Sequence, residues 1–235
     1  MKMQKEVQPR TATEYEAYDT TSSSYDNTRV PVGVETVIDF LSKNKVPLAE
    51  MDLLSIGCGT GNYEAELVER VGSILGIDYS AGMLVKARDK LGGFGKVILA
   101  QGDAAELGAV TELNGREGSF DAVIYMMSIH HVGDHERQAQ AFAQAYDMLK
   151  PGGELVIQTH DYKQLFDGFW WAELVPGAVS RIAERFLPID NLAFLLEEIG
   201  FEDVETVVHV DDVLQGESYK DVDGIFSKAW RDGDS

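Results

Sequence analysis

Hydrophobic residues follow two different patterns along the first two thirds of the chain. Short apolar runs alternate with stretches in which apolar residues recur at helical spacing. The runs predict strands near residues 52–56, 73–77, 96–100, 120–125 and 153–159. The stretches around them predict helices at 32–42, 62–70, 80–90, 104–113 and 134–148. Such alternation is typical of parallel strands joined by right-handed helical crossovers.

Beyond residue 160 the pattern is less regular. Residues 191–199 predict a helix that ends at Gly200, because glycine commonly follows the last helical turn. Two more apolar runs, 204–210 and 225–230, predict a final pair of strands. No internal repeat is visible, so we expect a single domain over 15–235, preceded by a polar, mobile segment at 1–14.

A glycine-rich turn follows the first predicted strand, in Ile56-Gly57-Cys58-Gly59-Thr60-Gly61-Asn62. An isolated acid, Asp78, ends the next apolar run. Glycines let a cofactor approach the backbone closely, and the acid can accept hydrogen bonds from two ribose hydroxyls. This order of elements therefore predicts a nucleoside-cofactor site. A dinucleotide fingerprint requires G-x-G-x-x-G, and Asn62 in the last position counts against an NAD-linked dehydrogenase.

Four further segments follow the glycine turn in a characteristic order. They are Gly76–Leu84, Gln101–Leu107, Ser119–Val132 and Leu149–Ile157. Together with the turn they resemble the class I S-adenosylmethionine-dependent methyltransferases, and most of all the ubiquinone/menaquinone-biosynthesis-like branch that acts on small molecules. The resemblance covers roughly residues 25–160 by specific motifs and the remainder only by pattern.

The resemblance implies both a fold and a reaction. The implied fold is α/β: a Rossmann-like, doubly wound, mostly parallel seven-stranded sheet with a C-terminal antiparallel hairpin and helices on both faces. The implied reaction transfers a methyl group from the sulfonium of S-adenosyl-L-methionine to a nucleophile by in-line displacement. Because this cofactor is already activated, the protein has mainly to position two partners and exclude water.

The resemblance also implies cofactor-binding roles, position by position. Asp78 would hold the ribose, Asp103 would meet the adenine edge, and Met126 would lie near the sulfonium. The full set of implied cofactor-binding residues is Tyr18, Tyr25, Arg29, Gly57, Cys58, Gly59, Gly61, Asp78, Tyr79, Met83, Asp103, Ala104 and Met126. Of these, Tyr18, Tyr25 and Arg29 belong to a segment, 15–31, that would form a lid over the cofactor; a capped helix with surface tyrosines is the alternative.

The acceptor side carries four candidate polar residues. His130 and His131 follow the fourth strand, where one could act as a general base because imidazole titrates near neutral pH. A structural or cofactor-binding role for one of them is the alternative. A metal site is not expected, because the His131–His135 pair lacks a third ligand. His160 and Asp161 end the fifth strand and either bind the acceptor or simply terminate the strand.

The segment after the fifth strand is unusually aromatic. Five aromatic residues lie between Tyr162 and Trp171, including Phe169 and Trp170. We expect an insertion at 161–190 to cover the acceptor, with these two side chains in contact with it. Packing of the same aromatics against the core is the alternative.

Charge and composition narrow the partners. The formal net charge of −20 disfavours binding to nucleic acid or to an anionic membrane surface. The single cysteine, Cys58, excludes an intrachain disulfide, and we expect it to be structural rather than nucleophilic. No apolar stretch approaches the roughly 20 residues that span a bilayer, and the start lacks the hydrophobic region of a signal peptide, so we expect a cytoplasmic protein.

Three functions remain open on the sequence. The leading one is methylation of an O, N, S or C atom of a small-molecule metabolite, by a monomer or homodimer. The second is methylation of a protein or a transfer RNA, which the acidic surface disfavours for RNA. The third is a module that binds S-adenosylmethionine without catalysis, because the glycine turn and Asp78 serve binding alone.

Overall fold

The computed structural model of the chain describes residues 25–27, 29–167, 172–173, 176–208, 223 and 226. Its centre is one sheet with the strand order β3-β2-β1-β4-β5, and every pairing between its strands is parallel. The strands are β1 (Asp52–Ile56), β2 (Ser73–Asp78), β3 (Val97–Gln101), β4 (Phe120–Met126) and β5 (Leu149–Gln158). This order is the Rossmann order, and the chain reverses direction across the sheet between β1 and β4.

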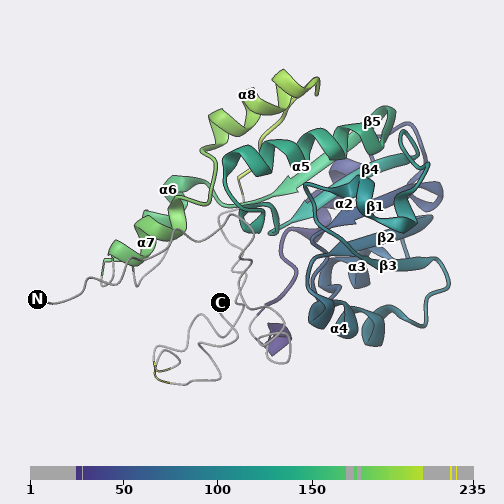
Figure 1. Cartoon of the computed structure of the whole chain (residues 1–235), viewed down its shortest axis with the longest axis horizontal. Coiled ribbons are helices and arrows are strands. Elements are labelled where there is room, and N and C mark those ends of the chain that lie inside the picture. Colours follow the sequence, from purple (N-terminus) through teal and green to yellow (C-terminus); the bar gives the residue numbers. More distant parts are fainter. Residues whose placement is uncertain are drawn as a thin grey trace, which may run out of the picture.

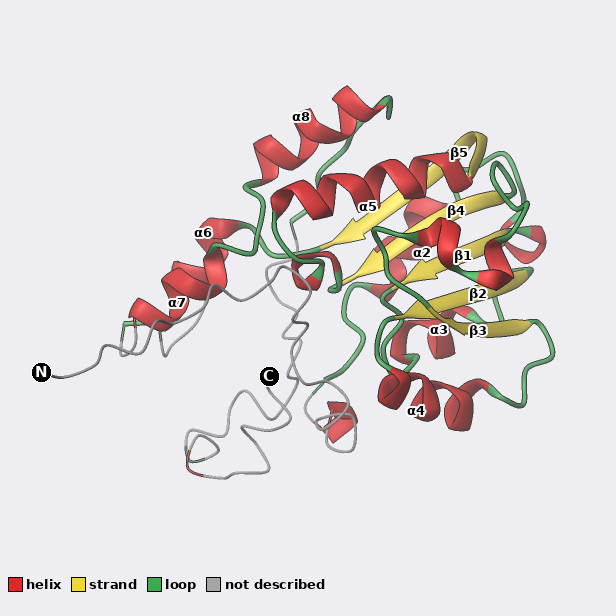
Figure 2. Ribbon diagram, in the orientation of Figure 1, coloured by secondary structure: helices red, strands yellow, loops and turns green. Residues whose placement is uncertain are grey.

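Helices cover both faces of the sheet (Figure 2). The α-helices of the described residues are α2 (Val34–Leu41), α3 (Asn62–Leu67), α4 (Ala81–Leu91), α5 (His135–Met148), α6 (Tyr162–Asp167), α7 (Pro176–Ala183) and α8 (Ile189–Ile199). One apolar core joins the sheet to α5 and α8, and a second joins its other face to α2 and α3. Alternate residues of β1 enter opposite cores: Leu54 faces α5, and Leu53 faces α3.

Two helices lie apart from these cores. In Figure 1, α6 and α7 extend beyond the carboxyl ends of the strands, away from the sheet. Their buried residues, among them Leu165 and Val179, form a separate small cluster with Phe186, which follows α7. The helices therefore stand next to the edge of the sheet at which parallel α/β folds bind their ligands.

Three predictions about elements need correction. Residues 104–113 form two short 3-10 turns, Leu107–Ala109 and Thr111–Leu113, instead of an α-helix. The buried residues Leu107, Val110 and Leu113 recur every three positions, which matches the three residues per turn of a 3-10 helix. The strand β5 also begins at Leu149, earlier than expected, because Leu149 pairs with Phe120 across an irregular register.

The third correction concerns the sheet itself. The described residues form five strands, not seven, and contain no antiparallel hairpin. Residues 204–208, the start of the first expected hairpin strand, have no regular structure and are mostly exposed. The rest of that strand, and all but Phe226 of the other, lie outside the described residues, as does the segment 1–14.

Candidate cofactor and acceptor site

The glycine turn lies where the carboxyl ends of β1 and β4 meet. Gly57, Gly59 and Gly61 all have positive φ, of 73°, 55° and 80°. The N–H groups of Gly57 and Cys58 both donate to the carbonyl of Ile77 in β2, at 2.7 and 3.0 Å. The turn is thereby fixed to the neighbouring strand, and left-handed backbone explains why glycine occupies these three positions.

Each glycine faces a different neighbour. A Cβ on Gly57 would lie 2.3 Å from the Cβ of Ser128, whose hydroxyl donates to the carbonyl of Ile56 at 2.8 Å. A Cβ on Gly61 would meet Leu91 at 2.7 Å, whereas a Cβ on Gly59 would meet nothing within 4 Å. At Gly57 and Gly61 the space of a Cβ is therefore occupied by neighbouring protein side chains. At Gly59 that space is empty, so a ligand can approach the backbone there.

Asp78 is held against this turn. One carboxylate oxygen accepts the N–H of Gly59 at 2.7 Å, and the other accepts the N–H of Ser80 at 2.8 Å. Ser80 in turn caps α4 by accepting the N–H of Met83. The acid predicted for the ribose therefore lies directly beside Gly59, the one of the three turn glycines with open space.

The second expected cofactor acid, Asp103, already has partners within the chain. Asp103 accepts the N–H of Ala105 at 2.9 Å and forms a short ion pair with Arg137 of α5. Both charged side chains are about 15% exposed.

The remaining cofactor candidates differ in exposure. Ala104 and Met83 are buried, whereas Tyr79 is 45% exposed, and its carbonyl accepts a hydrogen bond from Gln101. Met126, at the end of β4, is buried in the core on the α3 side.

Residues 25–27 and 29–32 lie across the glycine turn. Asp26 accepts from the Thr60 hydroxyl at 2.5 Å and pairs with Lys90 of α4 at 3.1 Å. The Arg29 guanidinium stands 5.7 Å from the centre of the Tyr25 ring, and burial raises the pKa of Tyr25. The Tyr63 hydroxyl accepts the N–H of Val32 at 3.2 Å. A lid of Tyr25 and Arg29 over the cofactor stays a prediction.

A buried carboxyl group lies beneath the turn. Glu64 of α3 is 1% exposed and accepts a short hydrogen bond from Ser55 of β1. Its other oxygen, Oε2, has no hydrogen-bond partner. Burial raises the pKa of Glu64 to about 7. The sequence analysis missed this residue, although an acid placed three and four positions before the buried Leu67 and Val68 was a visible signal.

The carboxyl ends of β4 and β5 carry three of the five histidines. The His130 ring lies 4.1 Å from His131 and stacks on Phe186 at 4.2 Å; His160 lies 5.9 Å from the same phenylalanine. Burial lowers the pKa of His130 well below its usual range, with a further contribution from His131, and burial also lowers the pKa of His160. All three predicted histidines are therefore brought together, and His130 is a neutral imidazole at pH 7.

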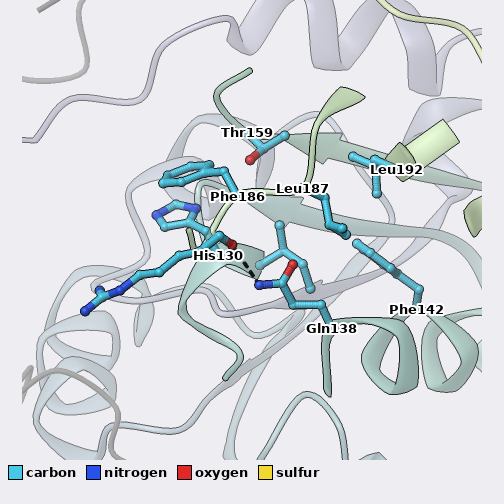
Figure 3. A pocket seen from close by; sticks show the side chains of 9 residues that line it. His130, Gln138, Phe142, Thr159, Phe186, Leu187 and Leu192 are labelled. Carbon is cyan, nitrogen blue, oxygen red and sulfur yellow. Dashed lines mark hydrogen bonds between the residues drawn. The ribbon is translucent and has the colours of Figure 1, made fainter. Parts of the chain in front are cut away.

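A small pocket adjoins this cluster (Figure 3). It encloses about 210 Å³, part of it open to solvent, and His130, Gln138 and Thr159 are among its polar lining residues. Gln138 donates to the carbonyl of Arg185 at 2.9 Å. The backbone nearby is strained, because Met127 has a φ of 52°, which is uncommon outside glycine and is found at functional sites.

Other candidate residues have less definite positions. The Asp161 side chain accepts the N–H of Lys163 and so begins α6, which is a structural role. Tyr18, Phe169 and Trp170 lie outside the described residues.

Cys58 is buried, and burial raises the pKa of its thiol well above the usual range, as a structural role for this cysteine predicts. Within the described segments no cluster of His, Cys, Asp or Glu could hold a metal, and no helix could cross a membrane.

The fold and this site define a nucleoside-cofactor-binding α/β protein of the Rossmann type. A family model described as a methyltransferase domain matches residues 53–153. Trans-aconitate 2-methyltransferase of Deinococcus radiodurans is 33% identical over 176 residues, which are 74% of this chain and 57% of that protein. Demethylmenaquinone methyltransferase of Clavibacter sepedonicus is 31% identical over 143 residues, 60% of this chain and 55% of that protein.

A solved structure has the same fold. Phosphoethanolamine N-methyltransferase 2 of Haemonchus contortus, in complex with S-adenosyl-L-methionine, matches with a TM-score of 0.60 and 24% identity, over 80% of this chain and 42% of that one. This chain spans less than two thirds of each of these three proteins. Together these matches support a class I S-adenosylmethionine-dependent methyltransferase, a family whose cofactor is S-adenosyl-L-methionine.

Proposed function

We propose that this chain transfers a methyl group from S-adenosyl-L-methionine to a small-molecule metabolite. The observation that carries the proposal is the contact between Asp78 and the N–H of Gly59 at 2.7 Å, next to open space over Gly59. The histidine cluster follows β4 and β5, at the same edge of the sheet. A cofactor cradle and a second group of polar residues are thus placed on opposite sides of the β1–β4 junction.

The chain's residues would have distinct roles in binding. Asp78 accepts the ribose hydroxyls, the Asp103–Arg137 pair lies at the adenine edge, and Tyr25 with Arg29 covers the cofactor. The bound cofactor supplies an activated methyl group, so the protein has to align the acceptor and exclude water. We propose that the segment 161–190 covers the acceptor, since α6 and α7 stand beyond the carboxyl ends of the strands (Figure 1).

A proton acceptor is necessary only for some nucleophiles. His130 is neutral at pH 7 because burial lowers its pKa, so it is in the form that can accept a proton. Its Nδ1 atom is buried and has no hydrogen-bond partner. We propose that His130, aligned by its stacking on Phe186 and its contact with the tilted ring of His131, takes the proton of a hydroxyl, amine or thiol acceptor.

The relatives support a small acceptor without selecting one atom. The named acceptors of the matched proteins are trans-aconitate, demethylmenaquinone and phosphoethanolamine, which differ in charge and size. The net charge of −20 also favours a metabolite over a nucleic acid.

The test separates acceptor classes. The purified chain is incubated with methyl-labelled S-adenosylmethionine and, separately, with a metabolite extract, a protein extract and transfer RNA, followed by mass spectrometry. Label in a metabolite is the expected result. Label only in protein or RNA would overturn the small-molecule proposal, and cofactor binding without any transfer would indicate a non-catalytic module. Asp78→Asn should lower the labelling by weakening cofactor binding, and Asp89→Asn, which changes an exposed acid of α4, is its control.

A further inference from the structure

Glu64 has no role in the function proposed so far, yet its environment is costly. The carboxyl group is almost completely removed from water, and Ser55 satisfies only one of its oxygens. A buried carboxylate without a partner is strongly disfavoured, so proteins either pair such a group or keep it protonated. An unpaired acid kept inside a core needs a reason.

Its position in the fold suggests the reason. Glu64 is the third residue of α3, directly after the turn that ends at Gly61, and Ser55 lies two residues before Gly57. The carboxyl group therefore sits between β1 and α3, underneath the glycine turn. Among the groups that influence it, Asp78 opposes its ionisation and Lys90 favours it, while the neighbouring Cys58 and Tyr63 are uncharged at neutral pH.

Lys90 is already engaged elsewhere. Its ammonium group pairs with Asp26 at 3.1 Å and donates a short bond to Asn62. Asp78 is likewise bound to Gly59 and Ser80. A buried acid that lacks a full counter-charge thus lies under the turn. The cofactor proposed to bind there carries two positive groups, the sulfonium and the α-ammonium.

We propose that Glu64 is the counter-charge for the cofactor, pairing as a carboxylate with a cationic group of S-adenosylmethionine held against the glycine turn. This inference rests on the proposed function. It makes cofactor binding release a proton from Glu64, because a nearby cation favours the ionised form. With a pKa of about 7, Glu64 in the free protein is about half protonated at pH 7 and about nine-tenths protonated at pH 6.

Calorimetry in buffers of different ionisation enthalpy counts this proton. At pH 6 we expect wild-type protein to release most of one proton on binding S-adenosylmethionine, and about half of one at pH 7. Glu64→Gln keeps the size of the side chain and an oxygen that can accept from Ser55, but it cannot release a proton. We expect this variant to lose the release and to bind about tenfold more weakly or worse.

Matched ligands and variants complete the test. The α-amino group of the ligand titrates near pH 8 and can also release a proton on binding. The release measured with Glu64→Gln gives this contribution of the ligand. The additional release by the wild-type protein then comes from Glu64. S-adenosylhomocysteine lacks the sulfonium charge, and methylthioadenosine lacks both charges, so this series identifies the paired cation. Ser55→Ala should keep the proton release, because the acid remains.

The outcomes separate this proposal from the function. Equal proton release in wild type and Glu64→Gln, or tight binding without release at pH 6, would overturn the role of Glu64 and leave methyl transfer standing. No binding of the cofactor to wild type would overturn the proposed function itself. If Glu64→Gln does not fold, infrared difference spectra of wild type decide, since binding must remove a protonated-carboxyl band.

Discussion

At the scale of single residues, two of the turn glycines, Gly57 and Gly59, predict different consequences of the same substitution. Gly57→Ala places a Cβ 2.3 Å from Ser128 and should lower the free energy of unfolding by about 2–4 kcal/mol, from overpacking and left-handed strain. Gly59→Ala adds strain alone, about 1–2 kcal/mol. Its methyl group enters the open space, so it should weaken cofactor binding. Urea unfolding and calorimetry on both variants measure the contrast, and equal stability loss would contradict it.

Asp78 makes a second prediction at this scale. Asp78→Asn removes the charged acceptor for the ribose hydroxyls, worth on the order of 1.5–3 kcal/mol per hydrogen bond. Affinity for S-adenosylmethionine, measured by calorimetry, should fall accordingly, while Asp89→Asn leaves it unchanged. Unaltered binding by Asp78→Asn would show that the ribose lies elsewhere.

At the scale of elements, the N-terminal segment depends on a few long-range contacts. The Tyr63 hydroxyl accepts from the N–H of Val32 and donates to Gln158 at 2.5 Å, and Gln158 donates back to the carbonyl of Val32 at 3.0 Å. These bonds join the segment to α3 and β5. A lid over the cofactor would depend on this anchor at Val32.

Tyr63→Phe removes this hydroxyl and nothing else. We expect faster amide hydrogen exchange at Val32 and a stability loss of about 1–2 kcal/mol. Cofactor affinity should fall if the segment is a lid, because more order must then be gained on binding. Unchanged affinity together with faster exchange would favour the alternative, a segment that merely packs on the surface.

At the scale of the whole molecule, buried histidines and Glu64 act in opposite directions. The pKa of His130 is lowered in the folded chain. Below about pH 6.5 the unfolded chain therefore takes up a proton that the folded chain does not, and the free energy of unfolding falls as the pH is lowered. The pKa of Glu64 is raised to about 7 in the folded chain. As the pH is lowered from 7 to about 4.5, the folded chain takes up a proton that the unfolded chain does not, and the free energy of unfolding rises.

Variants at these two positions should therefore diverge. Between pH 7.5 and 5.5, His130→Phe should lose less stability than wild type, and Glu64→Gln should lose more, each by up to about 1.4 kcal/mol per pH unit. Urea unfolding at the two pH values gives the differences. Parallel behaviour of the two variants would contradict the assigned protonation states.

The net charge gives a further prediction for the whole molecule. With a net charge of −20, repulsion between like charges destabilises the folded chain, and salt screens it. The midpoint of thermal unfolding should rise as sodium chloride increases to about 0.5 M. Exposed ion pairs such as Lys43–Glu205 weaken under the same conditions, but each contributes little. A falling midpoint would show that such pairs outweigh the repulsion.

Local patterns made much of the fold, and the position of the glycine turn beside Asp78, predictable from the sequence. The strands β1–β4 and the helices α2, α5 and α8 lie close to their expected positions, because apolar periodicity reflects which face of an element is buried. The glycine turn and Asp78 were predictable for a similar reason. Their chemistry follows from residues within one β-turn-α-β unit, so neighbouring sequence contains all the required information.

Tertiary structure alone decided the features that depend on distant residues. Packing turned 104–113 into 3-10 turns, placed Ser128 against Gly57, and engaged Asp103 with Arg137. It also left Glu64 buried beneath the turn with one oxygen unsatisfied. The sequence by itself determined where the elements and the cofactor turn lie, since local patterning encodes burial. Partners far apart along the chain depend on how faces meet in three dimensions, which no local pattern records.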